Sequence, residues 1–154
     1  MKICDLLTES RIVFDLKPGN KIEVLKRFVR ELKNRNLIQS EDIVLDGLID
    51  RENLGSTGLE RGIAIPHALI DDLPEEFIAL ALIKEGTNFE ALDQKPTYVF
   101  LMLLENSDKP GAQLKTLAHV CRLIKETDVV DKIRNSLEPR DVCRFFKEEE
   151  EKII

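Results

Sequence analysis

One stretch of the sequence, residues 50–68, collects the side chains best suited to chemistry. It holds His67, three of the seven glycines and a Gly-Ser-Thr-Gly turn. Neutral imidazole, with an ordinary pKa of about 6.5, is a good nucleophile near physiological pH. Arg51 supplies a permanent planar cation, the preferred partner of a phosphoryl group. These residue types together predict transient attachment of phosphate to His67.

The Gly-Ser-Thr-Gly turn is suited to binding an anion. Its glycines permit a positive φ and close backbone approach, so N–H groups of the turn can point at a phosphate. The hydroxyls of Ser56 and Thr57 either add donors to such a site or only form the turn, and the sequence leaves both interpretations open. Arg51 also has a second interpretation, as a cation at the C-terminus of a helix. Glu52 could orient either Arg51 or a backbone N–H.

His67 follows a short apolar segment that predicts a buried strand. Residues 62–65, Gly-Ile-Ala-Ile, are too few for a helix and are rich in β-branched side chains. Pro66 lacks the N–H that a strand ladder needs, so the strand should stop there. We therefore expect His67 where a strand runs out into a loop. An irregular or short helical connection should follow over residues 69–74.

This region resembles a known family. The similarity rests on the run Arg51-Glu52-x-x-Gly55-Ser56-Thr57-Gly58-x-x-x-Gly62-Ile63-Ala64-Ile65-Pro66-His67. The run is similar to the active-site region of the IIA domain of the bacterial sugar phosphotransferase system (PTS EIIA type 2, mannitol/fructose type). That family includes the stand-alone nitrogen-regulatory IIA proteins. The similarity in element order extends over roughly the whole chain.

The resemblance implies a role for each residue of the motif. His67 would accept phosphate, through Nε2, from the phosphohistidine of the carrier protein HPr. It would then pass the group to a cysteine of a IIB protein or domain that serves a fructose- or mannitol-class permease. Such transfer needs in-line approach and charge stabilisation more than acid–base chemistry. The implied phosphate-binding residues are Arg51, Ser56 and Thr57, and we expect neither a cofactor nor a metal.

The sequence departs from the family at a second histidine. Family members commonly carry one at the start of a helix, in a His-Leu-x-x-Leu context, near the phosphoacceptor. Here glutamine stands in its place, at Gln113. Its amide can donate to a phosphoryl oxygen or to His67 but cannot titrate, so transfer could be slowed; alternatively, Gln113 is a tolerated polar residue. His119 lies opposite the apolar face of the same predicted helix, which predicts a solvated surface histidine.

Three functions stay open at this point. The chain is a phosphoryl carrier of sugar transport, a nitrogen-regulatory binding module whose phosphorylation state controls partner proteins, or a degenerate IIA fold that no longer takes phosphate. The last is suggested by Gln113. For docking of HPr and IIB we expect an apolar collar near His67, formed by Leu59, Ala68 and Leu69.

Length and charge bound the class of protein. The 154 residues suit one domain, and the contents of 43% hydrophobic and 34% charged residues are ordinary for a globular chain. A net charge of −6 without a long basic run argues against binding to nucleic acid or to an anionic membrane. We find no signal-type segment and no apolar run of about 18 residues. Three scattered cysteines without metal-type spacing fit reduced thiols in a cytoplasmic protein.

The hydrophobic patterns predict a single-domain α/β sandwich over residues 1–154, with a small mixed sheet of four or five strands flanked by about five helices. Asn20 and Ser40 are candidate N-caps, and the acidic tail at 148–152 should fray in solvent. The predicted strands are 11–16, 62–65, 77–83 and 97–104. After a helical turn at 3–7, the first two predicted helices are 21–33 and 41–50. Ser107 or Asp108 should cap a third helix that has Pro110 in its first turn and runs to about 125. Thr127 or Asp128 should cap a fourth that runs through 133, and a last helix begins near 139.

Overall fold

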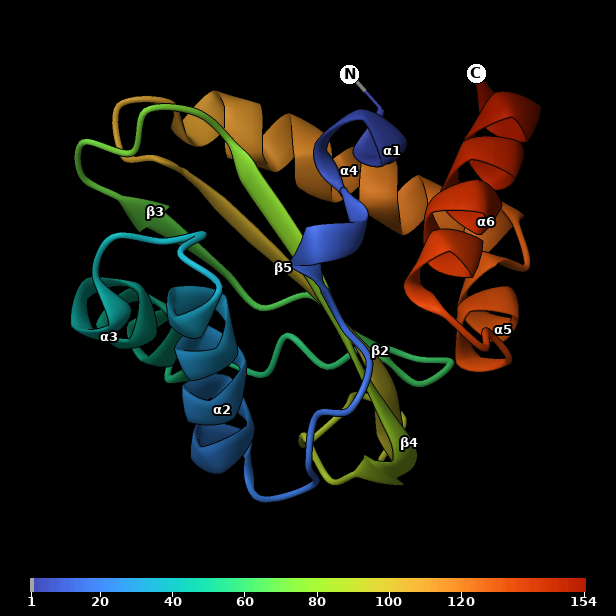
Figure 1. The fold of residues 1–154 in the computed structure, drawn as a ribbon, viewed down its shortest axis with the longest axis horizontal. Coiled ribbons are helices and arrows are strands. Elements are labelled where there is room, and N and C mark those ends of the chain that lie inside the picture. Colours follow the sequence, from blue (N-terminus) through green and yellow to red (C-terminus); the bar gives the residue numbers. More distant parts are fainter. Residues whose placement is uncertain (1) are drawn as a thin grey trace.

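Two long strands form the centre of the sheet, and three short strands flank them (Figure 1). A computed structural model describes residues 2–154. The strands within these residues are β1 (Ile12–Val13), β2 (Ile63–Ala64), β3 (His67–Ile70), β4 (Phe77–Thr87) and β5 (Thr97–Asn106). Their order is β1-β4-β5-β2, with β3 also paired to β5. Only β4 and β5 are antiparallel, so the sheet is mixed, as predicted.

Helices cover both faces of the sheet (Figure 1). One face packs against α2 (Lys21–Asn34) and α3 (Glu41–Glu52). The other face packs against α1 (Ile3–Leu6), α4 (Pro110–Glu126), α5 (Val129–Arg134) and α6 (Pro139–Ile153). A 3-10 turn, η1 (Glu9–Arg11), leads into β1. The predicted α/β sandwich is therefore confirmed.

The sheet divides the core into two clusters. Side chains alternate between faces along a strand, and β4 follows this rule over its continuous apolar run. Ala79, Ala81 and Ile83 join the cluster under α2 and α3. Ile78, Leu80 and Leu82 join the cluster under α1, α4, α5 and α6. Burial on both faces explains why this strand shows no polar alternation in the sequence.

Two helix starts follow their predicted caps and place Arg51. The Asn20 side chain accepts from the Glu23 N–H, and the Glu23 carboxylate accepts from the Asn20 N–H, which is a full capping box. The Ser40 hydroxyl accepts from the Ile43 N–H and begins α3. The last turn of α3 carries Arg51, so helix length fixes where this cation emerges.

The prediction of a loop after His67 is wrong. His67 is the first residue of β3, and residues 67–70 form a strand where an irregular connection was expected. β2 and β3 pair in turn with the same strand, Ile63 opposite Val99 and His67 opposite Leu103. Pro66 offers no N–H, but its carbonyl accepts from the Leu103 N–H at 3.0 Å. Pairing with the long β5 therefore continues on both sides of the proline.

The predicted strand at 11–16 is shorter than expected, because η1 occupies its start and only Ile12 and Val13 pair with β4.

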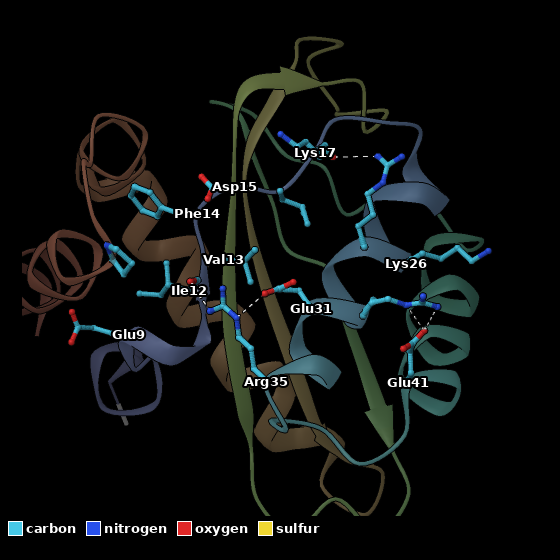
Figure 2. Close-up of a pocket in the computed structure, with 14 residues that line it drawn as sticks. Glu9, Ile12, Val13, Phe14, Asp15, Lys17, Lys26, Glu31, Arg35 and Glu41 are labelled. Carbon is cyan, nitrogen blue, oxygen red and sulfur yellow. Dashed lines mark hydrogen bonds and ion pairs between the residues drawn. The ribbon is translucent and has the colours of Figure 1, made fainter.

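A groove of about 760 Å³ lies between β1 and α2 (Figure 2). Within it, Arg35 donates to the carbonyls of Ser10 and Ile12 at 2.9 and 3.1 Å. Arg35 thereby covers the outer edge of β1, which discourages pairing with another strand.

The tail prediction and the His119 prediction are also wrong. α6 continues to Ile153 and buries Glu149 and Glu150 almost completely. Glu150 accepts from the N–H groups of Ile3 and Cys4 at 2.7 and 2.9 Å. His119 Nε2 lies 2.6 Å from the Glu150 carboxylate, and the His119 side chain is only 19% exposed, so His119 contacts α6 and is partly buried. These long-range partners replace water around the buried carboxylate.

No helix in the described part of the chain combines the length and apolar character needed to cross a lipid bilayer.

Candidate functional site

The hydrogen bonds of His67 define its tautomer. The ring is half-buried, and its Nδ1 lies 2.8 Å from the carbonyl oxygen of Ile65. A carbonyl oxygen only accepts, so Nδ1 carries the proton. Nε2 is then left with its lone pair, and the Arg51 Nε–H donates to it at 3.1 Å. Nε2 is therefore the unprotonated nitrogen of the ring.

Arg51 reaches His67 from the last turn of α3 and is itself held by the turn that follows. Its Nη1 donates to the Gly55 carbonyl at 2.9 Å, while its Nε points at Nε2 of His67. The structure brings these two predicted site residues together. The same contact places a planar cation beside the atom that would carry a phosphoryl group.

The surroundings keep His67 neutral. Burial of the ring lowers the pKa of His67 below its ordinary value, because the charged imidazolium loses water. The hydrogen bond to the Ile65 carbonyl opposes this change in pKa, and the positive charge of Arg51 reinforces it. An imidazole with a lowered pKa is unprotonated at physiological pH, which is the state that a nucleophile requires.

The hydroxyls of Ser56 and Thr57 are both engaged within the protein. Ser56 Oγ donates to the Phe89 carbonyl at 3.0 Å and accepts from the Gly58 N–H. The Thr57 hydroxyl donates to the carboxylate of Glu52, and the Thr57 N–H donates to the same carboxylate at 3.0 Å. In this structure both side chains hold the turn, which favours the turn-forming interpretation. A direct contact with phosphate stays a prediction.

Glu52 and Lys21 form a buried ion pair that sequence reasoning did not find. The Lys21 Nζ lies 3.0 Å from Glu52 Oε1, and the two side chains are 12% and 3% exposed. The sequence left the role of Glu52 undecided, and the structure bonds it to Thr57. Lys21 is 31 positions away in the chain, in the first turn of another helix, so no local pattern could connect it to the site.

Gly58 is required by the close approach of another backbone segment. A Cβ on this residue would lie 2.9 Å from the Cα of Ala91 and 3.2 Å from the Phe89 carbonyl oxygen. The Gly58 carbonyl accepts from the Leu92 N–H at 3.1 Å. Residues 89–92 therefore support the turn from behind, and only glycine leaves room for them.

Gln113 lies in the first turn of α4, is buried, and contacts the residue that follows His67. Its Nε2 donates to the Ala68 carbonyl at 2.8 Å. The side-chain amide thus holds β3 in place beside the imidazole, through a hydrogen bond to the backbone and not to the ring. Gln113 connects α4 to the strand that carries His67.

The predicted apolar collar is partly wrong. Ala68 is buried, and Leu59 is partly buried against the core under α4. Leu69 is 41% exposed, and two further leucines that the sequence did not single out, Leu54 and Leu114, are 84% and 68% exposed. Each of these three leucines lies within three residues of Arg51, His67 or Gln113 in the sequence. Burial depends on which side of a strand or helix packs inward, so this distinction required the fold.

Comparisons with known proteins agree with the resemblance noted in the sequence. Residues 5–149 match the family described as "Phosphoenolpyruvate-dependent sugar phosphotransferase system, EIIA 2". A nitrogen regulatory protein of Bradyrhizobium diazoefficiens is 31% identical over 136 residues, which cover 88% of each chain. The fructose-specific EIIABC component of the PTS of Bacillus subtilis is 27% identical over 84% of this chain, which covers 20% of that relative.

A solved structure shows the same fold. The nitrogen regulatory protein IIA-Ntr of Neisseria meningitidis superposes with a TM-score of 0.84 at 27% identity, covering 94% of this chain and 98% of that one. The family match spans nearly the whole chain, and one relative exceeds 30% identity over most of it. With its neutral imidazole, adjacent arginine and glycine-rich turn, this chain belongs to the EIIA type 2 family of the phosphoenolpyruvate-dependent sugar phosphotransferase system.

Proposed function

We propose that this protein carries a phosphoryl group on Nε2 of His67, taking it from phospho-HPr and passing it to a cysteine of a IIB partner. One observation carries the proposal: the lone pair of Nε2 faces the Arg51 guanidinium, while Nδ1 holds the ring proton against the Ile65 carbonyl. A nucleophile with a fixed direction and a cation at the reacting atom are the two things that phosphoryl transfer needs.

The first transfer is a displacement between two histidines. The Nε2 lone pair of His67 forms a bond to phosphorus as the phosphorus–nitrogen bond of the donor breaks. The donor ring keeps that electron pair, so no proton need move. Positive charge develops on the His67 ring, and the Ile65 carbonyl stabilises it through the Nδ1–H bond. Arg51 shifts its donors from Nε2 to the phosphoryl oxygens.

The second transfer reverses the first. A cysteine thiolate of the IIB partner attacks phosphorus, the phosphorus–nitrogen bond breaks, and Nε2 of His67 regains its lone pair. The lowered pKa of His67 favours this release, because the neutral ring is the preferred state of the empty protein.

The exposed leucines give the partners a docking surface. Leu54, Leu69 and Leu114 are exposed and lie close in sequence to Arg51, His67 and Gln113. An apolar patch formed by these leucines would suit the small interfaces of transient complexes. In this proposal the protein works in the cytoplasm, without membrane insertion and without nucleic acid.

A regulatory role is the second candidate. It is favoured by the two relatives named nitrogen regulatory proteins, which match this chain along most of their length. In that role the same phosphohistidine controls contacts with partner proteins, and the phosphoryl group is not passed on for sugar transport. The fructose-specific relative favours transport for a fructose- or mannitol-class permease. Both candidates share the chemistry of His67 and differ in the acceptor.

Labelling with phosphoenolpyruvate, enzyme I and HPr tests the proposal. We expect a phosphoryl label that is stable in base and labile in acid on the wild-type protein, and no label on His67→Gln. His119→Gln is the matched control, because it removes the other histidine and should keep the label. A label that survives His67→Gln contradicts the site, and an unlabelled wild-type protein indicates the degenerate fold.

A second stage separates the two roles. Labelled protein is mixed with purified IIB proteins of the fructose and mannitol classes. Rapid loss of label to a IIB cysteine supports transport. Retention of the label on His67 with every IIB protein supports the regulatory role.

A further inference from the structure

A continuous series of hydrogen bonds joins Glu52 to the imidazole of His67. The Glu52 carboxylate accepts from the N–H and the hydroxyl of Thr57. The Thr57 carbonyl accepts from the Ile65 N–H at 3.0 Å. The Ile65 carbonyl then accepts from His67 Nδ1 at 2.8 Å. The orientation of Thr57 therefore sets the position of the carbonyl that fixes the His67 tautomer.

The same carboxylate also bears on Arg51. Glu52 ends α3 directly after Arg51, and its backbone carbonyl accepts from the Gly55 N–H at 3.1 Å. The Gly55 carbonyl in turn holds Nη1 of Arg51. By fixing both ends of residues 52–57, Glu52 supports the two contacts that aim the ring and the guanidinium at each other.

Lys21 compensates the charge of the buried Glu52 carboxylate. A carboxylate that is 3% exposed is expensive to keep ionised unless a cation or several donors replace water. Lys21 provides that cation at 3.0 Å and is itself held over the Phe89 ring, with Nζ 5.0 Å from the ring centroid. The ionised form matters because a carboxylate accepts two donors from Thr57, whereas a protonated acid would offer a competing proton.

We propose that Glu52, paired with Lys21, is a positioning residue that holds His67 in its Nδ1–H tautomer and directs Nε2 toward Arg51 for phosphoryl transfer. Its effect on transfer rests on the proposed function, whereas its effect on the tautomer does not. A purely structural ion pair would stabilise the fold and leave the ring of the folded protein unchanged.

Nitrogen-15 NMR of the histidine rings tests the proposal, because the two ring nitrogens have different shifts in each tautomer. The chain has only two histidines, so His67 and His119 can be assigned with single variants. In Glu52→Gln we expect the Nδ1–H tautomer of His67 to lose its dominance above pH 7. Single-turnover transfer from phospho-HPr should fall by about tenfold or more, since a misplacement of 1 Å can cost up to ~10²-fold.

Glu41→Gln is the matched control. Glu41 opens the same helix and pairs with Arg30 at 3.0 Å on the surface. This variant should leave both the tautomer and the transfer rate unchanged. Thr57→Val, which removes the hydroxyl donor to Glu52 and keeps the N–H donor, should reproduce the defect in part.

If Glu52→Gln does not fold, Lys21→Met and Thr57→Val carry the test. The proposal is overturned if folded variants keep the wild-type tautomer, even where their melting temperature falls. If wild-type protein takes no phosphate but the variants still lose the tautomer, the positioning role stands and the phosphoryl-carrier function fails.

Discussion

The Nε–H of Arg51 donates to Nε2 of His67 at 3.1 Å, so the guanidinium of the unphosphorylated protein already occupies the direction from which a phosphoryl group would arrive. Phosphorylation of Nε2 would use this lone pair, and the hydrogen bond from Arg51 would then be lost. The second contact of Arg51, with the Gly55 carbonyl, does not involve the ring. Arg51 can therefore turn to the phosphoryl oxygens while it stays anchored at the turn.

Replacing Arg51 should raise the pKa of His67 and slow phosphoryl transfer. In Arg51→Gln the positive charge that opposes protonation of the ring is gone, so the pKa should move toward its ordinary value. Loss of the cation at the transferred group should slow transfer by about 10²–10³-fold, as for other preorganised donors. Titration of the His67 ring signals by NMR and a single-turnover assay measure the two effects. Arg30→Gln, on the surface ion pair with Glu41, should change neither.

The stability of the protein should depend on pH through His67. Because the folded state lowers the pKa of His67, the unfolded chain binds a proton more readily than the folded one. This residue's contribution is fully present above the unfolded pKa of about 6.5 and is lost as the pH falls through the lowered folded pKa. Urea unfolding of wild type and His67→Gln at several pH values measures it. We expect the free energy of unfolding of the wild type, relative to that of His67→Gln, to decrease as the pH falls below about 6.5. An increase would contradict the prediction.

Removing the Gln113 amide should lower the free energy of unfolding of the protein. Gln113→Leu leaves the buried Ala68 carbonyl without its donor, which costs about 1–3 kcal/mol. Leu114→Ala, at the next position and 68% exposed, should cost less than about 0.5 kcal/mol. Denaturant unfolding compares the two. Equal stabilities of the variants would show that the Gln113 contact contributes nothing.

A methyl group at Gly58 should not be tolerated. In Gly58→Ala the new Cβ meets the backbone of Ala91 at 2.9 Å, and overpacking against backbone costs about 1–3 kcal/mol. Gly111→Ala is the control, because nothing lies within 4 Å of its added Cβ in the first turn of α4. That variant should be neutral or stabilised by up to about 1 kcal/mol. Thermal melts of both variants check the contrast.

The buried acid near the C-terminus should matter for stability. Glu150→Gln weakens the bonds to the N–H groups of Ile3 and Cys4 and to His119, and should cost about 1–3 kcal/mol. Glu151→Gln, on the exposed side of the same helix, should be close to neutral. Unfolding curves measure both. If Glu150→Gln is as stable as the wild type, the buried contacts of Glu150 do not contribute to stability, and the frayed tail predicted from the sequence is the better description.

The local sequence predicted most of the helices and strands, and it predicted the family. Asn20 and Ser40 predict helix starts that the structure confirms, because capping depends on neighbouring backbone. The run from Arg51 to His67 predicts the family for a similar reason: a glycine-rich turn, a cation and a nucleophile must lie close together in the chain to be recognised.

Only the tertiary structure decided which residues support that site. Pairing with β5 turned the segment after Pro66 into a strand, and the fold brought Lys21 to Glu52, Ala91 to Gly58 and α6 to His119. None of these contacts follows a helical or strand period, since each joins segments that lie far apart in sequence. The tautomer of His67 was decided the same way, by a carbonyl and a guanidinium whose positions depend on packing.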